Sequence, residues 1–170
     1  GKAVLGDGEE TDADLFGREI PEDEELDASL YAQYRLLRRA PEYHLLGNHL
    51  LENGFSLLFG AYYFDDPALA RRAEQILRRQ LPEQILPDGG HFELSPMYHA
   101  IILFRLLDAV NLTERNPAPA GLTGAVRPEE GTAGGAAGAR GRTPLPQQLR
   151  EYARRMLAWL AAMRWDDGTL

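Results

Sequence analysis

Apolar residues recur at spacings of three and four in five separate stretches of this 170-residue chain, and no stretch shows a clear alternation of period two. A spacing of three to four places the apolar side chains on one face of an α-helix. The helices are expected at about 22–40, 42–64, 68–86, 96–110 and 147–164. The pattern therefore predicts an all-α fold.

Helix-boundary signals separate these stretches. Asp65, Asp66 and Pro67 supply an N-cap followed by a first-turn proline, and Ser95 with Pro96 repeats that order. The sequence Pro-Asp-Gly-Gly at 87–90 is typical of a turn, and a proline at position 82 is expected to kink or shorten the third helix. Short connections favour antiparallel hairpins, and five helices are too few to close a ring. We therefore expect an arc of a larger α/α toroid.

Two segments lack the helical pattern. Residues 1–21 are acidic and contain several glycines, so we expect them to be poorly ordered. Residues 113–144 are rich in Pro, Gly, Ala and Thr, which predicts a low-complexity insertion. The main helical part is then 22–112, and 145–170 holds one further helix. Both ends are interpreted as truncated, because the chain begins without Met and stops just after a turn signal at 166–168.

Charge and composition argue against several classes of partner. The net charge is −8, but residues 1–29 hold eleven acids against Lys2 and Arg18, so the remainder is nearly neutral. The sequence contains no basic stripe with interleaved aromatic residues, and we predict no nucleic acid partner. No apolar run is long enough to span a bilayer. The chain has no cysteine, which excludes disulfides and thiolate metal sites and leaves the compartment open.

Polar residues that could carry chemistry gather between positions 44 and 99. On the second helix His49 lies three residues from Glu52 and four from Asn53, so these side chains share a face. Inward-facing polar groups cost about 1–3 kcal/mol each when unsatisfied. Either an internal hydrogen-bond network or a polar pocket would offset that cost. The gathered residues are His44, Asn48, His49, Glu52, Asn53, His91, Glu93, Tyr98 and His99.

Three other chemistries find less support in the residues. His49 and Glu52 could share a metal with a second histidine, but no HExxH spacing occurs, and no metal is expected. Ser95 is already explained as an N-cap, which leaves little basis for a serine nucleophile. Glu52 and Glu93 could form a glycosidase-type carboxylate pair only if the fold brings a helix and a loop together.

Two strings of residues carry a family resemblance. They are Tyr43-His44-Leu45-Leu46-Gly47-Asn48-His49-Leu50-Leu51-Glu52-Asn53 and Glu83-Gln84-Ile85-Leu86-Pro87-Asp88-Gly89-Gly90-His91-Phe92-Glu93-Leu94-Ser95-Pro96-Met97-Tyr98-His99. Together they resemble the heparinase II/III-like family of polysaccharide lyases, closely over 22–112 and more loosely over 145–170. The resemblance implies part of an N-terminal α/α toroid. The family's C-terminal β-sandwich, which carries a structural zinc site in some relatives, is absent from this chain, so no cofactor is expected here.

The resemblance also implies an activity and roles for residues. The full-length protein would cleave an acidic polysaccharide, such as a glycosaminoglycan or alginate, by β-elimination, whereas this fragment alone would be inactive. Bacterial relatives favour a periplasmic or extracellular site of action. The alternatives are a non-catalytic helical glycan-binding or scaffold domain and an α/α-toroid glycoside hydrolase. The implied catalytic residues are Tyr98 and His49, and the implied substrate-binding residues are Asn48, Glu52, His91, Glu93 and His99.

Overall fold

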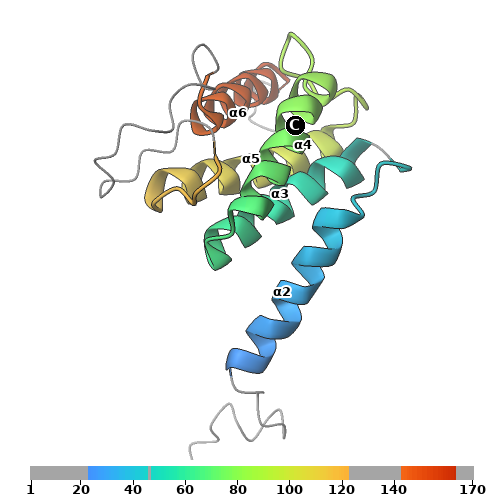
Figure 1. Ribbon diagram of the computed structural model, residues 1–170. Coiled ribbons are helices and arrows are strands. Elements are labelled where there is room, and N and C mark those ends of the chain that lie inside the picture. Colours follow the sequence, from blue (N-terminus) through green and yellow to red (C-terminus); the bar gives the residue numbers. More distant parts are fainter. Residues whose placement is uncertain (1–22, 46, 123–142, 164–170) are drawn as a thin grey trace, which may run out of the picture.

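Five helices make up the described part of the chain in the computed structural model, which describes residues 23–45, 47–122 and 143–163 (Figure 1). They are α2 (Asp23–Arg39), α3 (Gly47–Phe64), α4 (Pro67–Gln84), α5 (Pro96–Arg115) and α6 (Leu145–Ala162). Within those ranges there is no strand, and only an isolated bridge joins Ile85 to His91. The predicted all-α fold is confirmed. The acidic segment 1–21 and positions 123–142 of the predicted insertion lie outside the described residues.

The α3–α4 hairpin forms the centre of the structure. Asp66 caps α4 by accepting hydrogen bonds from the backbone nitrogens of Ala68 (2.6 Å) and Leu69 (3.2 Å). Pro67 follows at the first position, as the sequence predicted. The two helices bury a continuous apolar core, and each fully buried leucine contributes roughly 1.5–3 kcal/mol. Its largest members are Leu50, Leu51, Phe55, Leu57, Leu58, Leu69, Ile76, Leu77 and Leu81.

The remaining helices cover this hairpin from different sides. α5 and α6 pack against each other, and α6 contributes Leu149 and Met156 to the core. α2 projects from the rest of the molecule (Figure 1), and only one side of it reaches α3 and α4. Tyr34 of α2 lies so close to Gly60 of α3 that a Cβ there would come within 2.7 Å of its ring. Gly60 therefore permits this helix crossing.

Several helix boundaries differ from those expected. α3 begins at Gly47 rather than near residue 42, because hydrogen bonds from the Tyr43 nitrogen to the Pro41 oxygen and from the Leu45 nitrogen to the Glu42 oxygen form turns before it. Pro82 lies in the last turn of α4, which ends two residues earlier than predicted. α5 continues to Arg115, five residues past the expected end of the helix at 110 and into the first residues of the segment 113–144 that was predicted to be an insertion. None of the described helices combines the length and apolarity needed to cross a membrane.

Candidate functional site

The beginning of α3, the loop after α4 and the beginning of α5 meet in one region. Asn48 Nδ2 donates a hydrogen bond to Glu93 Oε1 (3.1 Å), which joins residues 45 positions apart. Gln84 Nε2 donates to the Gly47 carbonyl oxygen (2.8 Å), so the end of α4 is also fixed to the start of α3. The two strings that carry the family resemblance therefore come together in space.

The Pro-Asp-Gly-Gly turn shapes the loop that carries Glu93. Backbone hydrogen bonds run from the Leu86 nitrogen to the Gly90 oxygen and from the Gly89 nitrogen to the Leu86 oxygen. Gly89 has a φ of +95°, a conformation that favours glycine, and a Cβ at this position would clash with the Arg155 carbonyl of α6. The predicted turn is confirmed, and it serves to seat the loop against α6.

Tyr98 occupies the first turn of α5, as expected. Ser95 Oγ accepts a hydrogen bond from the Tyr98 backbone nitrogen (3.5 Å), which confirms the predicted N-cap. The Tyr98 residue is 38 % exposed, and its hydroxyl makes no hydrogen bond to any residue in the described ranges. Just before the cap, Leu94 has a φ of +55°, a strained conformation for a side chain of this size. The hydroxyl is therefore presented at the surface by a tightly constrained turn.

Asn53 and His49 both turn toward Glu42. Asn53 is buried, and its Oδ1 accepts a hydrogen bond from the Glu42 backbone nitrogen (2.8 Å) while its Nδ2 donates to Glu42 Oε2 (2.9 Å). His49 Nδ1 lies 3.8 Å from the same carboxylate oxygen, but its side chain is 65 % exposed. The shared face of His49 and Asn53 is confirmed. Asn53 belongs to an internal network, whereas His49 stays open to solvent.

Glu52 faces α5 rather than Glu42. Its Oε2 lies 3.3 Å from Arg105 Nε, and both side chains are partly exposed. Burial raises the pKa of the Glu52 carboxyl, and the Arg105 charge and hydrogen bond oppose that rise. Arg105 follows Tyr98 by seven residues, so the two share a face of α5. Glu93 and Arg105, which contact Asn48 and Glu52 of α3, thus lie before and after Tyr98 in the sequence.

His91 and His99 are buried behind this surface. Both ring nitrogens of His91 lack a hydrogen-bond partner among the described residues. His99 Nε2 lies 3.1 Å from the Met156 carbonyl oxygen, and its ring stacks on Trp159 of α6 at a centroid distance of 4.4 Å. Burial lowers the pKa of both imidazoles, although Glu93 opposes the shift at His91 and the Met156 carbonyl opposes it at His99. The geometry gives these two residues a supporting position.

The structure also brings in residues that the sequence did not single out. Glu52 contacts Arg105, and Asn53 contacts Glu42. His99 stacks on Trp159. Only Arg105 had a sequence signal, its seven-residue spacing from Tyr98. Glu52 contacts Arg105 and Glu93 contacts Asn48, so the contacts of these two residues give no support to a paired-carboxylate site. In the described ranges no three His, Asp or Glu side chains are arranged to hold a metal ion.

Comparisons with known proteins cover this region. A family model described as the heparinase II/III N-terminus matches residues 27–123, which is more than half of the chain. A heparin-sulfate lyase of Bacteroides stercoris is 33% identical over 76 residues, covering 42% of this chain and 11% of the relative. The matched part thus amounts to about a tenth of that relative's length. No solved structure gives a significant match.

Proposed function

The chain belongs to the heparinase II/III N-terminus family, and we propose that it carries part of the reaction centre of a lyase that cleaves uronate-containing glycans by β-elimination. The observation that carries the proposal is the hydrogen bond between Asn48 and Glu93. It joins the two motifs beside the turn that presents Tyr98. The activity is proposed for the complete gene product, because the matched part is a small share of the lyase relative.

The reaction needs stabilisation of negative charge on the uronate. Removal of the proton at C5 spreads charge onto the carboxylate, and fixed hydrogen-bond donors stabilise that charge in the transition state. Asn48 has two amide hydrogens, and Glu93 engages the nitrogen through one of them. Glu93 thereby orients the amide, and the second hydrogen is free to donate to the substrate carboxylate. His49, the next residue and largely exposed, supplies another donor.

Tyr98 is the proposed proton-transfer group. As a phenolate it removes the C5 proton; the C5–H electron pair forms the C4–C5 double bond, and the C4–O bond breaks with its electrons on the leaving oxygen. Tyr98, now a phenol, returns the proton to that oxygen, so the step is balanced. The first turn of α5 favours negative charge at this position. The constrained turn between Leu94 and Ser95 fixes the hydroxyl's approach.

The other predicted site residues support this arrangement. Glu52 holds Arg105 on the face of α5 that also carries Tyr98, so that Arg105 can contact an acidic group of the glycan. His91 and His99 are buried, which favours a role in supporting the loop and the first turn of α5 over direct contact with sugar. The proposed substrates are glycosaminoglycans or alginate.

The masses of the products test the proposal. The complete gene product would be incubated with heparan sulfate, hyaluronan and alginate, and the products would be weighed by mass spectrometry. Elimination yields oligosaccharides lighter by one water than the corresponding hydrolysis products. Saturated products would instead establish a glycoside hydrolase. Binding without any cleavage would establish a glycan-binding scaffold.

A further inference from the structure

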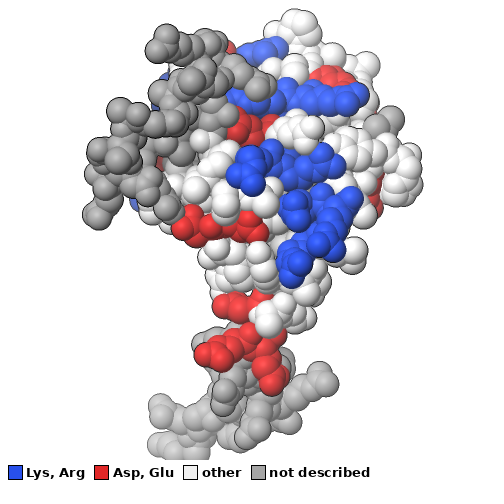
Figure 2. Space-filling model, viewed as in Figure 1, with Lys and Arg blue, Asp and Glu red and all other residues white. Residues whose placement is uncertain are grey.

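The outer side of α4 carries two pairs of arginines that the proposed reaction does not use. Arg71, Arg72, Arg78 and Arg79, here called the arginine ridge, repeat after seven residues, or two helical turns spanning roughly 10 Å. Arg71 and Arg79 are exposed, whereas Arg72 and Arg78 are partly buried. Figure 2 shows basic side chains gathered on this face of the molecule. One face of the described structure is therefore strongly basic, although the chain as a whole is acidic.

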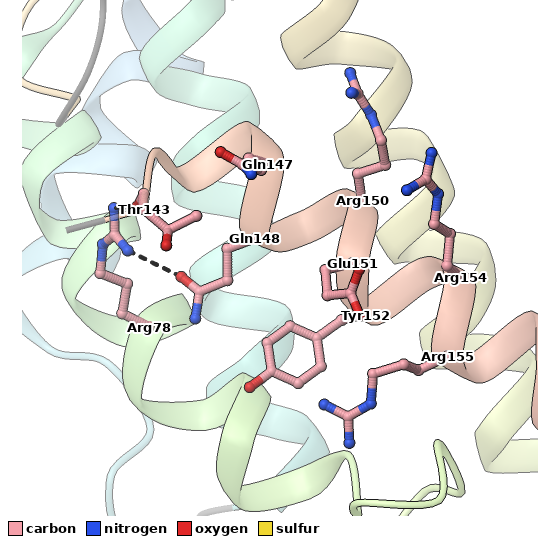
Figure 3. A pocket seen from close by; sticks show the side chains of 9 residues that line it. All are labelled: Arg78, Thr143, Gln147, Gln148, Arg150, Glu151, Tyr152, Arg154 and Arg155. Atoms are coloured by element: carbon pink, nitrogen blue, oxygen red, sulfur yellow. Dashed lines mark hydrogen bonds between the residues drawn. The ribbon is translucent and has the colours of Figure 1, made fainter. Parts of the chain in front are cut away.

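A hollow of about 570 Å³ lies at one end of the ridge, between α4 and α6. Four of its lining residues are arginines, and only Glu151 is acidic. Figure 3 shows Arg78 and Arg155 approaching it from α4 and α6, with Gln148 and Tyr152 between them. This volume falls in the range of roughly 300–1,000 Å³ that small-ligand sites occupy.

The arginines within the hollow are held in place by the protein. Arg78 bonds to Glu74 (2.7 Å), to Gln148 (2.9 Å) and to the Thr143 carbonyl (2.9 Å). Arg155 donates to the Leu86 carbonyl at the start of the Pro-Asp-Gly-Gly turn, and its guanidinium lies 5.2 Å from the centroid of the Tyr152 ring. These contacts preorganise the donors, and Arg155 links the hollow to the loop that carries Glu93.

Exposed arginines that are not neutralised by any described residue surround the fixed arginines of the hollow. Arg71, Arg79 and Arg154 are exposed and make no hydrogen bond or ion pair with any residue in the described ranges. A second hollow, of about 310 Å³, lies at the other end of the ridge and is lined by Arg38, Arg71 and Arg72, with Ala68 and Gln75. The ridge thus connects two basic hollows and offers an elongated track for an anionic chain.

We propose that the arginine ridge and the α4–α6 hollow bind a stretch of anionic glycan outside the reaction centre. Guanidinium groups bind carboxylates and sulfates through paired hydrogen bonds, and such groups recur along an acidic polysaccharide. This assignment rests on the proposed function for the identity of the polymer. The bound stretch lies beside the loop held by Arg155, so it keeps the polymer next to the reaction centre.

The aromatic side chains on this face argue for a glycan over a single-stranded nucleic acid. Nucleic acid sites of that kind stack bases on open aromatic rings. Here a guanidinium lies over each nearby tyrosine ring, Arg72 over Tyr43 at 5.4 Å and Arg155 over Tyr152 at 5.2 Å. The face therefore offers charged and amide donors rather than stacking surfaces.

Affinity for a size-defined heparin hexasaccharide tests the proposal in the complete gene product. The variant Arg71→Ala/Arg79→Ala/Arg154→Ala removes three exposed charges and no hydrogen bond or ion pair of the described structure, so it is expected to fold. Its affinity should fall roughly tenfold, the scale of three exposed ion pairs. Added salt should weaken binding to the wild-type protein more than binding to this variant. On a cleavable polymer the defect should appear in KM rather than in kcat.

Two matched proteins complete the experiment. Arg115→Ala removes an exposed arginine in the last turn of α5 and should bind the hexasaccharide like wild type. Tyr98→Phe should keep hexasaccharide affinity even if cleavage is lost, which separates this inference from the proposed reaction. Unchanged affinity in the triple variant, or an equal loss in Arg115→Ala, would overturn the proposal. Binding of single-stranded DNA as tightly as heparin of equal charge would overturn the assignment to a glycan.

Discussion

Removal of the side-chain amide should have opposite consequences at two asparagines of α3: it should lower stability at Asn53 and lower activity at Asn48. Asn53→Ala deletes the hydrogen bond from the Glu42 backbone nitrogen and the one to the Glu42 carboxylate. Asn53 is only 7 % exposed, so water does not readily replace the lost partner. Asn48 is more accessible and makes one hydrogen bond, to exposed Glu93.

The contacts set the size of the difference. A neutral hydrogen bond contributes about 0.5–1.5 kcal/mol to stability and one to a charged group about 1.5–3 kcal/mol. Asn53→Ala should therefore lower the free energy of unfolding by on the order of 2–4 kcal/mol. In a domain of this size the melting temperature should fall by on the order of 10 °C. Asn48→Ala should change stability by less than about 1 kcal/mol.

Thermal unfolding followed by circular dichroism measures both effects in the 170-residue chain, and activity is measured in the complete gene product. Asn48→Ala should abolish most activity and keep a melting temperature close to that of wild type. Asn53→Ala should have a lower melting temperature than wild type but should retain kcat at a temperature where it is folded. A melting temperature for Asn53→Ala close to that of wild type would refute the structural role given to this amide.

Three further changes have defined outcomes. Gly89→Ala should destabilise the chain by about 2 kcal/mol or more, because it combines a positive φ with a clash against the Arg155 carbonyl. Limited proteolysis within 85–94 should become faster, and an unchanged melting temperature would contradict this packing. Burial lowers the pKa of His91 and His99 below 6.5, so as the pH falls these imidazoles take up protons in the unfolded chain before they do so in the folded chain. The contribution of the two neutral histidines to the free energy of unfolding is therefore complete above about pH 6.5 and is lost as the pH falls. Melting temperature should therefore drop from about pH 7 to about pH 5, and less steeply in His91→Gln/His99→Gln; identical slopes would exclude both histidines as the cause. Arg105→Ala should cost less than about 1 kcal/mol of stability, because its ion pair is half-exposed, yet should lower kcat/KM on uronate polymers; unchanged kinetics would remove Arg105 from the site.

Local signals predicted much of the fold. Asp66 and Ser95 cap helices where the sequence placed them, because an N-cap involves residues only two or three positions apart. The Pro-Asp-Gly-Gly turn is equally local. The start of α3 was predicted too early because the turns before it are held by Asn53, eleven residues further along. That contact leaves no periodic signal.

The candidate site depended more on distant contacts. The sequence supplied Asn48, Glu93 and Tyr98, but only the fold brings Asn48 to Glu93. The burial of His99 depends on Trp159 of α6, beyond the region matched by the family model. The seven-residue repeat of the arginine ridge is present in the sequence, but without interleaved aromatic residues it did not by itself indicate a binding surface. Its hollow requires α6 to pack beside α4.

The most direct test of the proposed reaction is the ultraviolet absorbance of unsaturated uronate during incubation of the complete gene product with uronate polysaccharides. The proposal predicts a steady rise with at least one polymer and its near-complete loss in Tyr98→Phe. Tyr43→Phe, which alters a tyrosine of similar exposure, should retain the rise. An undiminished rise in Tyr98→Phe would contradict the role given to this hydroxyl, and no rise in a folded wild-type protein with any of the polymers would contradict the lyase proposal itself.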